Sequence, residues 1–222
     1  MPHMTAPIPA RRTAVALAVT ALATAVTAAT TTDATAAPAD RPAAATASAA
    51  RTSGPAGLKG VDYAVWQRDV QAVIDRALPY VKERTADAHG RKQAIVLDID
   101  NSSLETDFHW TYPTPAIAPV LELTRYAHAR GAAVFFVTAR PGILDSLTEY
   151  NLREVGYPVS GLYVRHLPDL FQDVSTYKTA KRAEIEKQGY SIIANIGNNT
   201  TDLVGGHAER TFKLPDYDGK LS

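Results

Sequence analysis

Two aspartates separated by one residue form the most chemically suggestive pair in the chain. Asp98 and Asp100 follow the apolar run 93–97, which is typical of a buried strand in a parallel sheet. A spacing of two along an extended strand points both carboxylates to the same side. Such a pair can supply a nucleophile and a general acid–base, or bind a hard cation such as Mg²⁺. Taken alone, an aspartate pair is most often a solvated turn or a helix cap.

Further polar residues suited to chemistry follow later apolar runs or open the helix between them. They are Thr138, Arg140, Lys178, Asn198 and Asp202. A hydroxyl, loop N–H groups and a lysine at one rim make an anion site, while carboxylate and amide oxygens suit Mg²⁺ better than zinc. An anion site and a metal site beside a spare carboxylate are suited to phosphoryl transfer.

Each of these residues also has an ordinary structural alternative. Thr138 could cap the helix that begins near Pro141, and Arg140 could form a surface salt bridge instead of contacting a substrate. Lys178 competes with Lys181, which lies nearly one helical turn later. We expect Lys178 to reach the site because it is nearer to the strand ends.

The elements that must position these residues alternate between helix and strand. Helical spacing of apolar residues predicts helices over 61–88, 117–130, 143–155 and 179–188, with a short helix near Leu203. Short apolar runs predict strands over 93–97, 132–137, 161–164 and 191–196, with an edge strand over 211–214. This order predicts an α/β three-layer sandwich around a parallel, Rossmann-like sheet, whose strand ends gather the ligand-binding residues.

Composition excludes several classes of protein. The 222 residues carry 23 Lys and Arg against 23 Asp and Glu, so the net charge offers no basis for binding nucleic acid or a membrane surface. The absence of Cys excludes disulfides, a thiolate zinc site, an iron–sulfur cluster and a cysteine nucleophile. The length suits one ordinary domain plus additional segments.

The N-terminal pattern is typical of an exported protein. Arg11 and Arg12 precede the uncharged stretch 13–32, and an Ala-x-Ala site follows at 34–36. We therefore expect residues 1–36 to be a secretory signal peptide and the mature protein to be secreted, with no membrane association after cleavage. A transmembrane anchor is the weaker alternative, since the stretch is rich in Ala and Thr.

The next segment, 37–57, consists mainly of Ala, Pro, Thr, Ser and Gly. It contains too few bulky apolar residues to offset the entropy of ordering, so we expect a disordered linker. The folded domain is then expected over 58–222.

Four motifs in order resemble those of the haloacid dehalogenase-like (HAD) hydrolases. Asp-x-Asp-x-Ser from Asp98, the threonine at 138, the lysine at 178 and Gly-Asn-Asn-Thr-Thr-Asp at 197–202 carry this resemblance. The stretches at 177–182, 189–190 and 210–215 resemble more narrowly the acid phosphatase branch, subfamily IIIB, which includes the plant vegetative-storage-type proteins. The resemblance covers roughly residues 93–222.

The resemblance implies a Mg²⁺-dependent phosphomonoesterase that hydrolyses small phosphate monoesters through an aspartyl-phosphate, and the N-terminal pattern predicts that this enzyme is secreted. Asp98 would be the nucleophile and Asp100 the general acid–base. The implied phosphate-binding residues are Ser102, Thr138 and Lys178. The implied metal-binding residues are Asp98, Asp100, Asn198 and Asp202. The family usually has aspartate at position 198, so the asparagine removes a negative charge from the metal site.

A small cap is expected at about 103–116, where this family carries an insertion. His109 and Trp110 in this aromatic segment could contact the substrate, although packing onto the sheet explains the segment about as well. Two other functions stay open: a catalytically weak or inactive phosphate-binding, metal-binding or storage protein, and a phosphotransferase that passes the phosphoryl group to an alcohol. The sequence does not indicate the natural substrate or the oligomeric state.

Overall fold

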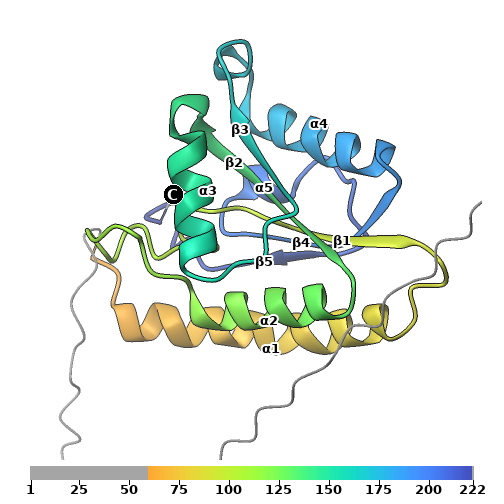
Figure 1. Cartoon of the computed structure of the whole chain (residues 1–222). Coiled ribbons are helices and arrows are strands. Elements are labelled where there is room, and N and C mark those ends of the chain that lie inside the picture. Colours follow the sequence, from red (N-terminus) through yellow and green to blue (C-terminus); the bar gives the residue numbers. More distant parts are fainter. Residues whose placement is uncertain (1–59, 222) are drawn as a thin grey trace, which may run out of the picture. The chain divides into compact units, whose positions relative to one another are not determined.

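A five-stranded, all-parallel sheet organises the residues that this computed structural model describes, 60–221 (Figure 1). The predicted signal peptide, 1–36, and the predicted linker, 37–57, lie outside the described residues. The strand order is β3-β2-β1-β4-β5. The strands are β1 Lys92–Leu97, β2 Ala133–Pro141, β3 Gly161–Arg165, β4 Tyr190–Gly197 and β5 Thr211–Lys213.

Helices cover both faces of this sheet (Figure 1). They are α1 Tyr63–Ala86, α2 Ala118–Ala129, α3 Asp145–Glu154, α4 Val174–Lys187 and α5 Thr200–Leu203, with two 3₁₀ turns, η1 Gly142–Leu144 and η2 Asp169–Phe171. The predicted α/β three-layer architecture is therefore confirmed. Of the helices within residues 60–221, none has both the length and the apolar character that crossing a bilayer requires.

Alternation along β1 explains why its sequence is continuously apolar. Ile95 and Leu97 belong to the core cluster that includes α1 and α2, whereas Ala94 and Val96 belong to the cluster that includes residues of α4. All four side chains are buried, because helices cover the strand from both sides. The polar residues that follow Leu97 thus lie at the carboxyl end of a buried central strand.

The structure differs from the sequence prediction at the start of α4. The helix begins at Val174, five residues earlier than expected, because the Asp173 side chain caps it by accepting a hydrogen bond from the Thr176 N–H. Lys178 therefore lies in the second turn of the helix rather than at its start. Strand β2 is also longer than predicted, and its last residue, Pro141, pairs with Arg165 of β3.

The segment predicted as a cap, 103–116, contains turns and isolated bridges rather than a helix or a regular strand. Its Phe108 ring stacks on Trp66 of α1 with 4.3 Å between ring centroids, and lies edge-on to Tyr63. Glu105 is buried and accepts hydrogen bonds from the Tyr63 hydroxyl at 3.0 Å. This part of the segment packs against α1.

Candidate active site

A cavity of about 260 Å³ lies at the carboxyl ends of β1, β2 and β4, the three neighbouring central strands. Its lining residues are Asp98, Asp100, Thr138, Ala139, Val174, Lys178, Asn198, Asn199, Thr201 and Asp202. Six of the predicted site residues therefore converge, although more than 100 residues separate the first from the last in sequence. The parallel sheet explains this convergence, since it brings all the strand ends to one edge.

Lys178 joins two of the carboxylates at the base of this cavity. Its Nζ lies 2.6 Å from Asp98 Oδ1 and 2.5 Å from Asp202 Oδ1, and all three side chains are almost completely buried. Burial raises the pKa of Asp98 to about 6 against the opposing charge of the Lys178 ammonium. Burial would lower the pKa of Lys178, but the two carboxylates outweigh it and raise that pKa above its usual value. The two carboxylates therefore favour the ammonium form of Lys178.

Asp100 is held by a different cation. Arg140 Nε and Nη2 donate to its two carboxylate oxygens at 3.0 Å and 2.7 Å, and the Thr106 hydroxyl donates to Oδ1 at 2.9 Å. Burial would raise the pKa of Asp100, but these hydrogen bonds and the charge of Arg140 outweigh it, so the pKa is lowered. Arg140, which the sequence suggested as a substrate contact, is here the partner of Asp100.

Thr138 and Asp202 complete the polar wall. Thr138 is buried, and its hydroxyl oxygen accepts a hydrogen bond from the Arg140 N–H at 3.2 Å, so its proton is available to donate. Asp202 Oδ2 accepts from the Asn199 N–H at 2.8 Å, which forms a capping box at the start of α5. A Cβ at Gly197 would come within 2.4 Å of that Asp202 oxygen, so only glycine permits this close approach.

Asn198 connects the site to the end of the chain. Its Oδ1 accepts a hydrogen bond from the Ser102 hydroxyl at 3.0 Å, and its Nδ2 donates to the Leu221 carbonyl at 2.6 Å. The same Ser102 oxygen accepts from the Asn198 N–H at 2.9 Å. Ser102 is completely buried and does not line the cavity, so the structure does not bring its hydroxyl to the expected phosphate position.

Two other predicted contacts also lie away from the cavity. Trp110 is 85% exposed, and His109 pairs through Nε2 with Glu105 at 2.7 Å. Neither is among the residues that line the cavity. The substrate contacts expected of them stay predictions without support from this geometry.

Arg182 is a residue of the site region that sequence reasoning missed. It is buried, and it donates to the backbone carbonyls of Asp202 at 2.7 Å and Gly206 at 2.9 Å, and also to that of Val204. The guanidinium thus holds the end of α5, which carries Asp202, together with the residues that follow it. In the sequence it belongs to a run of charged residues, 181–187, that is typical of a solvated helix face.

The oxygen donors at the site suit a hard divalent cation. Asp98 uses only Oδ1 for Lys178, and Asp100 and Asn198, whose backbone carbonyl and side-chain amide oxygen could also bind a cation, line the same cavity. Asp202 engages both carboxylate oxygens, with Lys178 and with the Asn199 N–H. Within residues 60–221, no group of three or more His, Cys, Asp or Glu side chains is arranged to hold a metal. A metal ion here would depend on backbone and amide oxygens beside one free carboxylate oxygen.

Comparison with known proteins yields plant relatives and bacterial structures. The chain is 34% identical over 133 residues to the stem 28 kDa glycoprotein of Glycine max, covering 57% of this chain and 51% of the relative. It is 32% identical over 156 residues to acid phosphatase 1 of Solanum lycopersicum, covering 68% of this chain and 57% of the relative. The chain thus spans about half the length of these relatives.

The fold is similar to that of the class C acid phosphatase from Bacillus anthracis. The TM-score is 0.52 at 18% sequence identity, covering 69% of this chain and 81% of that structure. At this identity the similarity shows the fold. A family model for HAD superfamily, subfamily IIIB (acid phosphatase) matches residues 19–220. This match confirms the resemblance of the four motifs, and the chain belongs to subfamily IIIB of the HAD superfamily.

Proposed function

We propose that this protein is a Mg²⁺-dependent phosphomonoesterase that hydrolyses small phosphate monoesters through an aspartyl-phosphate on Asp98. The observation that carries the proposal is the convergence of Asp98, Lys178 and Asp202 beside Asp100 in one cavity. The Asp98 carboxylate provides a nucleophile, and the buried Lys178 ammonium provides a cation for the phosphoryl oxygens. Membership of an acid phosphatase subfamily and the similarity to a named acid phosphatase support the same activity.

In the first step, a carboxylate oxygen of Asp98 attacks phosphorus while the bond from phosphorus to the ester oxygen breaks. Asp100, in its protonated form, gives its proton to the leaving oxygen. Lys178 and the Thr138 hydroxyl bind the phosphoryl oxygens and neutralise their charge. Bound Mg²⁺, held by Asp98, the Asp100 carbonyl and Asn198, would add positive charge beside those oxygens.

In the second step, water attacks the phosphorus of the aspartyl-phosphate and its proton passes to Asp100. The bond from phosphorus to Asp98 breaks, which releases inorganic phosphate and restores the carboxylate. Because Arg140 favours the ionised form of Asp100, the resting site is prepared for this second step. The first step then proceeds best with leaving groups that need little protonation, such as phenolates.

Replacement of Asp98 by asparagine tests the proposal. Asp98→Asn keeps an acceptor for Lys178 but removes the nucleophile, so we expect turnover of p-nitrophenyl phosphate with Mg²⁺ to disappear. Asp75→Asn makes the same chemical change on the exposed face of α1 and is the matched control. Substantial remaining turnover in Asp98→Asn, with turnover in Asp75→Asn unchanged, contradicts an aspartyl-phosphate at this residue.

A non-catalytic phosphate-binding or storage protein is the second candidate. It is favoured by Asn198, whose amide already bonds Ser102 and the C-terminal segment instead of offering a carboxylate. Steady release of phosphate that stops on chelation of Mg²⁺ supports the enzyme. Binding of phosphate without any release of phosphate from esters supports the storage protein.

We also propose that the protein is exported, because residues 1–36 have the sequence pattern of a signal peptide. N-terminal sequencing of the protein recovered outside the cell tests this. A mature N-terminus close to residue 37 is expected, and recovery of the intact N-terminus from the cell interior contradicts export.

A further inference from the structure

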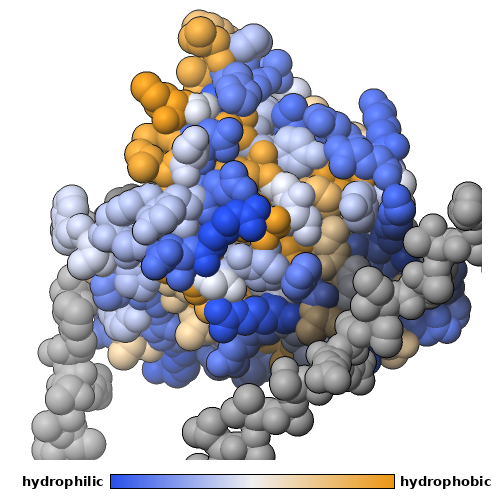
Figure 2. Space-filling view, viewed as in Figure 1, coloured by the Kyte–Doolittle hydropathy of each residue, from blue (hydrophilic) through white to orange (hydrophobic). Residues whose placement is uncertain are grey.

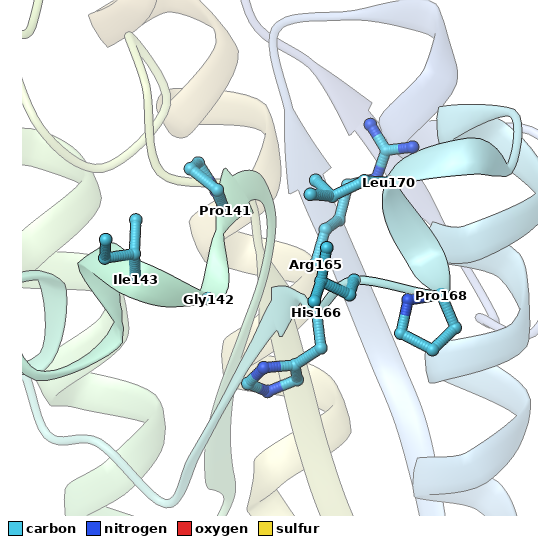
Figure 3. Close-up of a pocket in the computed structure, with 8 residues that line it drawn as sticks. Pro141, Gly142, Ile143, Arg165, His166, Pro168 and Leu170 are labelled. Carbon is cyan, nitrogen blue, oxygen red and sulfur yellow. The ribbon is translucent and has the colours of Figure 1, made fainter.

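A second, larger cavity lies beside the candidate active site, between the end of β2 and the loop after β3 (Figure 3). Its volume is about 520 Å³, against about 260 Å³ for the candidate active site. Its lining residues are Pro141, Gly142, Ile143, Arg165, His166, Leu167, Pro168 and Leu170. In Figure 3 residues 141–143 form one wall and residues 165–170 form the other. We call this cavity the apolar groove.

Both walls of the apolar groove are formed by segments that also line the candidate active site a few residues away. On one side, Thr138 and Ala139 line the active site, while Pro141 and Gly142, two or three residues further along, line the groove. On the other side, the chain that lines the groove up to Leu170 continues to Val174, which lines the active site. A molecule bound in the active site therefore has the groove as its neighbour.

The groove presents apolar side chains to solvent. Ile143, in η1, is 88% exposed, and Leu167, in the turn after β3, is 74% exposed. Figure 2 shows hydrophobic atoms gathered at the top of the view, over the loop after β3 and the upper end of α3. Exposed apolar residues that line a cavity and adjoin a polar site are typical of a ligand-binding surface.

The polar residues of the groove do not oppose an apolar ligand. Arg165 already donates to the Asp169 carbonyl at 2.7 Å and to the Gln172 carbonyl at 2.6 Å. The His166 ring lies against Gly142, where a Cβ would come within 2.4 Å of its Nδ1. The lining includes no acidic side chain, so it does not repel an anionic ester bound next door.

We propose that the apolar groove binds an aromatic leaving group of the phosphate monoester, and so makes aryl phosphates the preferred substrate class. The inference rests on the proposed function, since the phosphoryl group must occupy the neighbouring cavity. A flat ring fits between two apolar walls and gains from burying Ile143 and Leu167.

The test compares 2-naphthyl phosphate with glycerol 2-phosphate, whose small polar leaving group gains little from the groove. In the double variant Ile143→Ser/Leu167→Ser, we expect kcat/KM for naphthyl phosphate to fall about tenfold, mainly through KM. The value for glycerol 2-phosphate should stay unchanged. Leu147→Ser is the matched control, because Leu147 is an exposed leucine of α3 that does not line the groove. Both substrates falling equally, or neither falling, overturns the proposal.

Direct binding separates this inference from the proposed function. Calorimetry with naphthylmethylphosphonate and methylphosphonate requires no turnover, and we expect the double variant to lose about tenfold affinity for the aromatic ligand alone. If no ester is turned over but the double variant shows this selective loss of affinity, the result contradicts phosphatase activity and supports aromatic binding in the apolar groove. If the unaltered protein turns over esters but the double variant shows no selective loss of affinity, the result contradicts aromatic binding in the apolar groove and supports phosphatase activity. A change in oligomeric state in the double variant, without loss of discrimination, overturns the proposal in favour of contact between copies.

Discussion

Replacement of Asn198 by aspartate separates the two roles that this residue can play. The structure gives its Nδ2 a buried hydrogen bond of 2.6 Å to the Leu221 carbonyl, and a carboxylate cannot donate that bond. An unpaired buried carbonyl costs about 1–3 kcal/mol, and a new charge near Asp98 and Asp202 adds to it. Without Mg²⁺, we expect Asn198→Asp to lose about 2–3 kcal/mol of unfolding free energy, or about 4–12 °C in Tm.

Mg²⁺ should partly reverse this loss, because the new carboxylate is a better ligand than the amide. Tenfold tighter binding corresponds to about 1.4 kcal/mol of additional stabilisation under saturating Mg²⁺. The variant should then be only about 1 kcal/mol less stable than the unaltered protein. The assay is urea denaturation followed by circular dichroism, with Mg²⁺ and with a chelator, so that it does not depend on activity.

Asn151→Asp is the matched control for this experiment, because it makes the same change outside the cavity. Asn151 is buried, and its Nδ2 donates to the Thr114 carbonyl at 2.9 Å, a bond that a carboxylate cannot donate. We expect this variant to lose stability as well, and we expect Mg²⁺ not to reverse the loss. If metal-free Asn198→Asp is as stable as the unaltered protein, the link to the C-terminal segment is unimportant. If Mg²⁺ stabilises Asn198→Asp and the unaltered protein equally, residue 198 does not bind the metal.

Two further substitutions test the electrostatics of the buried groups. Lys178→Met should cost about 3–5 kcal/mol in urea denaturation, because it leaves Asp98 and Asp202 buried without their cation, and a loss below 1 kcal/mol contradicts the buried ion pair. Burial raises the pKa of Glu105 in the folded protein above its ordinary value of 4.5. Between pH 4.5 and the folded-state pKa, the folded protein therefore binds more protons than the unfolded chain. Stability falls as the pH rises through this window. Glu105→Gln removes this titration while keeping an acceptor for His109. The stability of this variant relative to the unaltered protein should therefore increase with pH across that window. A stability difference that does not change with pH contradicts the raised pKa.

The central site was predictable because it rests on short-range patterns. The buried strand before Asp98 is apolar on both faces, and the parallel order of the strands brings Thr138 and Asp202 to the same edge. Family motifs then assigned roles that the spacing alone could not. Six of the residues predicted from these two sources line the cavity, whereas Ser102, which the family motif also implied, does not.

What the sequence did not predict depends on long-range side-chain choices. Ser102 has a suitable hydroxyl, but that hydroxyl bonds Asn198, and the amide in turn bonds a carbonyl at the far end of the chain. Arg182 looks like part of a solvated charged face, yet three backbone carbonyls satisfy its buried guanidinium. Neither arrangement has a local pattern, because the partners come from segments that only the completed fold brings together.

The two aspartates of the first motif differ in charge environment because each has its own cation. Burial raises the pKa of Asp98 against the charge of Lys178, which Asp98 shares with Asp202, whereas the hydrogen bonds and charge of Arg140 outweigh burial and lower the pKa of Asp100. A nucleophile must be ionised and a general acid protonated, so the lowered pKa of Asp100 opposes its role in the first step. A divalent cation beside Asp98 would favour the ionised form of Asp98. Asp100 stays paired with Arg140, which favours the ionised form of Asp100 as well. We therefore expect esters of acidic alcohols such as phenols to be hydrolysed fastest, because their leaving groups need the least protonation.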